Sequence, residues 1–448
     1  MGLQGTQTAQ WFERARNVLV NGVSSGYRYS GDDDTLVISH GEGGYIWDMD
    51  GRRYLDFQCG WGTNILGHGD PDVAAAVAEA VTSCTSFAMT QQREVEAAEK
   101  VVSCLRWPER MRFTNTGAEA TMHAIRLARG VTGRDLILKF EGTYHGAHDY
   151  VLFTTPGAPP GDLGSRRRPI PHQASSGIPE AIRTYIRTLP FNDVEQVEAF
   201  FEDHGHEVAA ILAEPMLGNS FGILPEPGFL ETLRRLCDEY SSVLIFDEVK
   251  TGFRIGLGGA VEAFGVIPDI GTYAKAIGNG LPVAAIAMNA RMAAGLQAGG
   301  IFQGGTYSGN GVSAAAVHAT LSKLETGEPF RRIEETGTAL MEGLQKILDA
   351  KGVESKVVGK PAMFSIFMGE GTPREFRDAA RHDHRLHAAT VLGMIERGVM
   401  PCYDALEPWF LCAAHNAEDV AITLAAFEES LEETLARAGD IPALFDEA

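Results

Sequence analysis

Short apolar runs alternate with amphipathic segments through the middle of the chain. The runs that we expect to form buried strands are 136–140, 208–213, 243–246 and 283–288. The amphipathic segments that we expect to form helices are 72–83, 117–129 and 228–239. Near-continuous apolar strands separated by such helices predict an α/β fold, in which helices cover both faces of a mostly parallel central sheet.

The two ends of the chain show a different pattern. Residues 1–60 predict a helix at 8–20 and then a hairpin, whose strands at 45–49 and 53–57 flank Asp50-Gly51. After about residue 325, short strands at 355–358 and 362–367 and a last helix at 417–437 predict a smaller α+β domain. We therefore expect three parts: an N-terminal segment (1–60) that packs with the small domain, a large domain (61–324) and a small C-terminal domain (325–448).

Composition and charge narrow the classes of protein. The chain has 44% hydrophobic and 22% charged residues, as in ordinary globular proteins, and a net charge of 38 − 59 = −21. This charge argues against nucleic acid or an anionic membrane surface as a partner. Residues 292–322 contain no charged side chain, but their glycines and polar residues argue against a membrane helix. The six cysteines show neither disulfide nor metal-ligand spacing, which favours reduced thiols in a cytoplasmic protein.

Two charged residues of the large domain are candidates for catalytic chemistry. Asp247 follows the run 243–246 directly, and strand ends in an open α/β sheet face the ligand crevice. A helix cap is the alternative role for this carboxylate. Lys275 has no charged neighbour from Thr272 to Ala290, and burial there would lower its pKa and suit a Schiff-base amine. An exposed lysine beside a turn is the alternative.

Three loops add candidate ligand contacts. Thr116 and Glu119 form a capping-box pattern at the start of helix 117–129, and a helix N-terminus with a hydroxyl can bind phosphate. An ordinary capped helix has the same pattern. Tyr144 and His145 lie on a glycine-flanked loop and can stack on a flat cofactor ring. The glycine-rich loop 304–310 is a weaker phosphate candidate.

These features together indicate pyridoxal 5'-phosphate. This cofactor needs a lysine, an acid against its ring nitrogen, a stacking group and phosphate donors. The chain accordingly resembles class III pyridoxal-phosphate-dependent aminotransferases, among them glutamate-1-semialdehyde 2,1-aminomutase, from about residue 18 to 424. The motifs that carry this resemblance are Asn21–Ser25 with Arg28, Trp47–Gly51, Gly67–Pro71, Thr116–Ala120, Phe140–Gly146, Glu214-Pro215 with Asn219, Phe246–Arg254 and Gly305–Asn310.

The resemblance implies a fold type I transferase and assigns roles to named residues. Lys275 is similar to the lysine that forms the cofactor aldimine and moves the substrate proton, and Asp247 to the partner of the ring nitrogen. The other cofactor contacts that it implies are Val249 and Tyr144 on the two ring faces, His145 beside them, Glu214 and Asn219 near the ring hydroxyl, and Thr116, Gly117 and Ala118 at the phosphate. Thr306 resembles a phosphate ligand donated across a homodimer interface, and Arg28 the arginine that binds the substrate carboxylate.

Departures from the aminomutase pattern bear on the reaction. Lys250 stands where the aminomutase usually has a neutral residue, and the stretch 403–410 is altered. The segment 155–178, with an Arg166–Arg168 triplet, is expected to be a surface loop that is either disordered or a lid. The altered stretch and the triplet suggest a bulkier or more acidic substrate. We therefore predict amino transfer from an amino compound to a separate keto acid or aldehyde. Intramolecular transfer by a glutamate-1-semialdehyde 2,1-aminomutase is the alternative, a racemase is a lesser one, and a non-catalytic pyridoxal-binding module is the alternative from another class.

Overall fold

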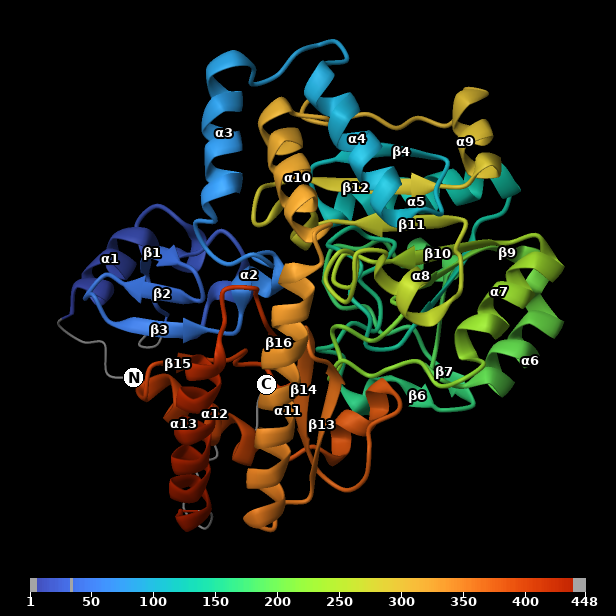
Figure 1. The fold of residues 1–448 in the computed structure, drawn as a ribbon. Coiled ribbons are helices and arrows are strands. Elements are labelled where there is room, and N and C mark those ends of the chain that lie inside the picture. The colour runs from blue at the N-terminus through green and yellow to red at the C-terminus, as the bar shows by residue number, and fades with distance from the viewer. Residues whose placement is uncertain (1–5, 33–34, 438–448) are drawn as a thin grey trace.

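A seven-stranded sheet forms the centre of the molecule in the computed structural model, which describes residues 6–32 and 35–437 (Figure 1). In spatial order its strands are β4 (Arg110–Thr114), β12 (Ala284–Met288), β11 (Ile270–Tyr273), β10 (Val243–Asp247), β9 (Val208–Ala213), β5 (Leu136–Phe140) and β8 (Ile186–Leu189). β12 runs antiparallel to both of its neighbours, whereas the pairs from β11 through β8 are parallel. The predicted mostly parallel α/β sheet is confirmed.

Helices cover both faces of this sheet because successive strand side chains point to opposite sides. Ile245 of β10 lies in one buried cluster with residues of α5 (Gly117–Thr132). Leu244 and Phe246 lie in another cluster with residues of α6 (Val194–His204) and α7 (Phe229–Tyr240). Helices expected at 117–129 and 228–239 are thus present, and they extend to within three residues of the predicted ends.

The carboxyl ends of four neighbouring parallel strands deliver the predicted site residues. β10 ends at Asp247, β9 ends just before Glu214, and β11 ends two residues before Lys275. β5 leads into the loop that carries Tyr144. Parallel strands end at the same edge of a sheet, so this topology brings together residues that lie up to 131 positions apart in sequence.

Two smaller sheets hold the ends of the chain. β1 (Ile38–Glu42), β2 (Tyr45–Asp48) and β3 (Arg53–Asp56) form the predicted N-terminal hairpin region, and β15 (Val399–Met400) adds parallel to β3. β13 (Ser355–Lys360), β14 (Met363–Met368) and β16 (Trp409–Phe410) form a three-stranded antiparallel sheet. Near them lie α11 (Glu328–Ala350), α12 (His384–Glu396) and α13 (Ala417–Ala436) (Figure 1). The N-terminal segment therefore shares a sheet with the C-terminal part; the domain boundaries at 60 and 324 stay a prediction.

The remaining helices connect these layers. They are α1 (Gln7–Arg16), α2 (Cys59–Gly62), α3 (Pro71–Ser83), α4 (Gln92–Leu105), α8 (Gly259–Phe264), α9 (Ala290–Gln297) and α10 (Gly311–Leu324). α1 ends four residues before the predicted end at 20, because the backbone is already extended at Leu19 (φ −119°, ψ 139°). Among the described residues, no helix has the length and apolar character needed to cross a membrane.

The segment 155–178 has a defined path. It contains a short hairpin of β6 (Gly164–Ser165) and β7 (Arg168–Pro169), and the side chain of Leu163 is buried. Arg166 pairs with Asp193 at 2.9 Å and Glu375 at 3.1 Å. The Arg166 guanidinium is therefore committed to these two carboxylates, so Arg166 itself is not available to bind an acidic substrate.

Candidate active site

A cavity of about 190 Å³ opens at the strand ends. The predicted residues that line it are Gly117, Ala118, Tyr144, His145, Glu214, Asn219, Asp247, Val249 and Lys275. Lys250 and Met216 also line it. The fold thus gathers an amine, an acid, aromatic groups and a helix N-terminus around one space.

Asp247 is held from three sides. One carboxylate oxygen, Oδ2, lies 2.6 Å from Nδ1 of His145, and the other accepts from the Thr272 hydroxyl at 3.0 Å and the Val249 N–H at 3.1 Å. Only 4% of the residue is exposed. Burial lowers the pKa of His145, although Asp247 acts in the opposite direction. His145 therefore has two roles: it lines the cavity, and its contact with Oδ2 fixes the orientation of the Asp247 carboxylate.

Lys275 has a strained backbone and a lowered pKa. Its φ is +52°, a conformation that residues with a side chain rarely adopt and that concentrates at functional sites. Its Nζ donates to the carbonyl of Trp61 at 2.8 Å. Burial, followed by the charge of Lys250, lowers the pKa of Lys275 to about 7. An amine with this pKa has a substantial neutral fraction near pH 7 and can act as a nucleophile or a base.

Glu214 organises the loop with the stacking tyrosine. Its carboxylate is fully buried and accepts from the N–H groups of Tyr144 and Gly218, both at 2.8 Å, and from the Asn219 amide at 2.7 Å. Burial raises the pKa of Glu214 to about 7. The tyrosine ring itself meets the Tyr27 ring edge-on at 5.8 Å. Glu214 and Asn219 therefore form one hydrogen-bonded unit at the cavity wall.

The N-terminus of α5 faces the cavity. The Thr116 hydroxyl accepts from the Glu119 N–H at 3.1 Å, which makes Thr116 the N-cap. The predicted capping box is only half present, because the Glu119 carboxylate accepts from Asn115 and not from Thr116. The first N–H groups of a helix have no partner within it, so those of Gly117 and the next residue can bind an anion. A Cβ on Gly117 would come within 2.9 Å of Val249, so glycine keeps this wall open.

Besides Thr116, which caps α5 next to the cavity, two further predicted contacts do not line the cavity of the single chain. Arg28 is exposed, in a 3₁₀ turn from Gly26 to Arg28, with its guanidinium carbon 5.9 Å from the centre of the Trp61 ring. Thr306 lies in an exposed turn. The roles of both residues, like the cofactor contacts above, stay predictions.

Three groups at or near the cavity were given no site role by the sequence analysis. Lys250 forms an ion pair with Glu407 and donates to the Gly218 carbonyl at 2.8 Å. Trp61 supplies the carbonyl next to Lys275, and the only local signal for it is a pair of flanking glycines. Arg254 stands behind that turn and is fully buried. Lys250 and Glu407 each lie in a stretch that departs from the aminomutase, but 157 positions separate them, so their pairing has no local signal.

The residues present suit pyridoxal phosphate. The cavity offers an amine with a lowered pKa, a fixed carboxylate, a stacking ring and unpaired helix N–H groups, which correspond to the parts of that cofactor. His145 Nε2 is a buried nitrogen on the cavity wall for which the described residues provide no hydrogen-bond partner.

Comparisons with known proteins agree with this geometry. The profile of the family Aminotransferase class-III matches residues 28–423. A glutamate-1-semialdehyde 2,1-aminomutase of Desulfitobacterium hafniense (strain Y51) is 38% identical over 427 residues, which is 95% of this chain and 97% of that protein. An omega-transaminase from Sphaerobacter thermophilus is 33% identical, with a TM-score of 0.89 and coverage of 96% of this chain and 98% of that one. A solved transaminase with PLP bound is 29% identical, with a TM-score of 0.85 and the same coverage.

Site and fold together define a pyridoxal-phosphate-dependent enzyme of fold type I. The chain belongs to the class III aminotransferase family, and its cofactor is pyridoxal 5'-phosphate. When bound, this cofactor withdraws electrons from the substrate carbon that bears the amino group. The predictions of fold, family, cofactor and enzyme class are confirmed, and both external and intramolecular amino transfer agree with the relatives.

Proposed function

We propose that the enzyme transfers an amino group from an amino compound to a separate keto acid or aldehyde. The observation that carries this choice is the ion pair that Lys250, which lines the cavity, forms with Glu407, whose charge acts on Lys275. An aminomutase must hold a compound with two amino groups until the second half of its reaction. A carboxylate near Lys275 is the natural partner for the additional ammonium, but in this chain Lys250 already neutralises that carboxylate.

The free-energy cost of separating Lys250 from Glu407 supports this argument. The Lys250 side chain is 8% exposed and that of Glu407 is 22% exposed. Separating a largely buried pair leaves an uncompensated charge, at a cost of about 3–5 kcal/mol. A substrate ammonium would have to displace Lys250 against this cost to reach Glu407. A donor and an acceptor that bind in turn have no such requirement.

We assign the remaining roles as follows. Lys275 carries the cofactor and moves the proton of the substrate, and Asp247 keeps the ring nitrogen protonated. Val249 and Tyr144 contact the ring faces, and Glu214, Asn219 and His145 orient the ring and its acid. Thr116, Gly117 and Ala118 bind the phosphate, and Arg28 binds the substrate carboxylate. The cavity lining and the hydrogen bonds described above support these roles for the residues that line the cavity, whereas those of Thr116 and Arg28 rest on the resemblance to the family.

We further propose a cytoplasmic homodimer with shared active sites. Thr306 is exposed and does not line its own chain's cavity. The same loop exposes Phe302 (76%) and Tyr307 (63%), and the neighbouring segment exposes Met89 (81%). The Gln91 amide and the Gly309 carbonyl join these two segments at 2.9 Å. Large exposed apolar side chains on neighbouring segments are typical of an interaction surface, which supports a partner subunit here.

External and intramolecular amino transfer can be distinguished with one substrate. The pyridoxamine form of the enzyme is incubated with glutamate-1-semialdehyde, without a keto acid, and formation of 5-aminolevulinate is followed. We expect no turnover, but amino transfer to pyruvate or 2-oxoglutarate from another donor. Turnover at about 1 per second or faster, a rate typical of enzymes, would refute external transfer as the main activity.

Variants at the ion pair test the reason for that choice. Lys250→Met should free Glu407 and increase affinity for a vicinal diamino acid, measured by competitive inhibition. Glu407→Gln removes the carboxylate and is the matched control, for which we expect no gain. If Lys250→Met gains no affinity, the ion pair does not exclude the diamine.

A further inference from the structure

A left-handed turn supplies the carbonyl that contacts Lys275. The four residues of α2, from Cys59 to Gly62, have φ values of +45°, +62°, +55° and +82°. Glycine adopts such values without cost, but Cys59 and Trp61 do not. Strain of this kind persists where the surrounding structure over-determines the backbone. Because the Trp61 carbonyl accepts from Lys275 Nζ at 2.8 Å, the shape of this turn sets the position of a reacting atom.

Arg254 is the group that holds the turn. Its guanidinium is completely buried and donates to the Gly62 carbonyl from Nη2 at 2.7 Å and from Nε at 3.3 Å. Its Nη1 donates to the carbonyls of Leu411 at 2.9 Å and Ala362 at 3.2 Å. Within the part of the chain that the structure describes, no carboxylate forms an ion pair with it. A buried arginine normally pairs with an acidic residue. Arg254 is unusual because its acceptors are neutral carbonyls from three separate segments.

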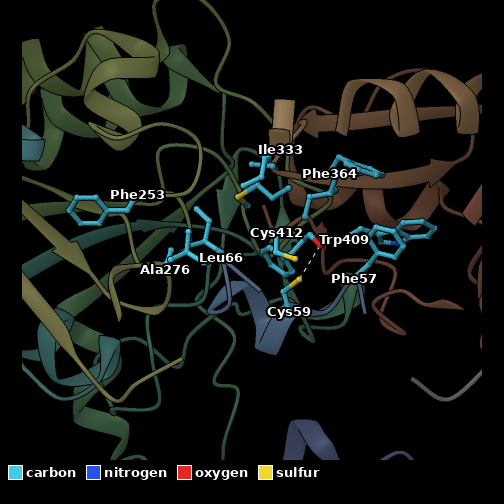
Figure 2. Packing of buried hydrophobic residues seen from close by; sticks show 14 of the residues in the cluster. Phe57, Cys59, Leu66, Phe253, Ala276, Ile333, Phe364, Trp409 and Cys412 are labelled. Carbon is cyan, nitrogen blue, oxygen red and sulfur yellow. Dashed lines mark hydrogen bonds between the residues drawn. The ribbon is translucent and has the colours of Figure 1, made fainter. Parts of the chain in front are cut away.

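Packing around Gly62 leaves the turn little freedom. A Cβ on Gly62 would come within 2.8 Å of the Phe410 ring and 3.3 Å of Arg254 Nε. Figure 2 shows the core around the turn: Cys59 lies beside Cys412, and Phe57 beside Trp409, so the two ends of the chain meet here. The guanidinium therefore joins the turn to the C-terminal part of the chain.

We propose that Arg254 is a positioning residue, whose guanidinium fixes the turn from Cys59 to Gly62 and thereby aims the Trp61 carbonyl at Lys275. It touches neither cofactor nor substrate and acts through the backbone. The proposal rests on Lys275 being the reacting amine of the family reaction, but not on whether transfer is external or intramolecular.

A purely electrostatic role makes a different prediction. The charges that act on Lys275 are those of Lys250 and Arg254, which lower its pKa, and of Glu407 and Glu214, which raise it. If charge were the whole contribution of Arg254, a lysine at that position would replace it. If the planar, forked shape of the guanidinium matters, a lysine cannot replace Arg254, because one ammonium cannot reach three carbonyls from separate segments.

Arg254→Lys and Gly62→Ala test the proposal in the holoenzyme. In its pyridoxamine form Lys275 is a free amine, and its acetylation by acetic anhydride can be followed against pH by peptide mass spectrometry. We expect the wild-type midpoint near pH 7. In both variants the ammonium loses a well-placed acceptor, so the midpoint should fall. Misplacement of the amine should lower kcat about 100-fold, with KM within about threefold of wild type.

Arg234→Lys is the matched control. Arg234 is a half-buried arginine on α7 that pairs with Asp238 of the same helix and with Asp269, and it does not line the cavity. Thermal unfolding and bound cofactor are measured for all three variants. If Arg254→Lys matches wild type in midpoint and kcat, the proposal is wrong. It is also wrong if both test variants lose thermal stability or cofactor while Lys275 titrates as in wild type, because Arg254 would then act on folding alone. Failure of external transfer would leave the Lys275 midpoint readout unaffected, so the two proposals fail separately.

Discussion

Replacing Asp247 by asparagine isolates the contribution of its charge. The carboxylate is 4% exposed and accepts three hydrogen bonds. In the variant, the amide oxygen can still accept from Thr272 and Val249, so the loop keeps its shape. The amide nitrogen replaces Oδ2 and cannot stabilise a protonated ring nitrogen. Removing one partner of a buried charge pair costs about 3–5 kcal/mol. At 1.36 kcal/mol per decade, this is roughly two to four decades in rate.

Stopped-flow absorbance of the lysine-bound cofactor on addition of an amine donor measures this effect directly. We expect a loss of about three decades in the first half-reaction, with the cofactor still bound through Lys275 and the N-terminus of α5. His145→Gln is the control, since it removes a partner of Asp247 but keeps the carboxylate; its loss should be about 10- to 100-fold, the effect of one hydrogen bond to a charged group. An Asp247→Asn enzyme within tenfold of wild type would refute the role of the charge. Equal losses in both variants would assign the effect to His145.

Three further predictions address the other assigned residues. Borohydride reduction of the holoenzyme should fix the cofactor on Lys275, and recovery of the adduct on Lys250 in peptide maps would show the assignment to be wrong. Sedimentation should show a dimer, and mixing Lys275→Ala with Thr306→Ala chains should restore up to one intact site per heterodimer, because both lesions then fall in the same site; a fully active monomer would contradict this. Arg28→Lys should raise KM for amino acids more than for simple amines, because lysine lacks the planar fork that binds a carboxylate through two hydrogen bonds; equal increases would place the carboxylate elsewhere.

Local signals in the sequence were sufficient for four of the seven strands of the central sheet and for the central pair of residues, but not for β4, β8 and β11. Apolar runs predicted β5, β9, β10 and β12, because burial on both faces removes polar residues from a strand. Asp247 was identifiable because it directly follows a predicted strand, and Lys275 because it lies in a long stretch without another charged residue. The resemblance to the family added residues whose spacing alone carried little information, such as Asn219.

Tertiary structure decided the contacts that tune these residues. The pairing of Lys250 with Glu407 joins positions 157 apart, and Arg254 bonds to carbonyls 192, 108 and 157 positions away. Backbone carbonyls such as that of Trp61 exist at every residue, so no side-chain pattern marks the one that contacts Lys275. The amine and the acid follow from local sequence because local burial selects them, whereas their orientation and pKa depend on which distant segments the folded chain brings against them.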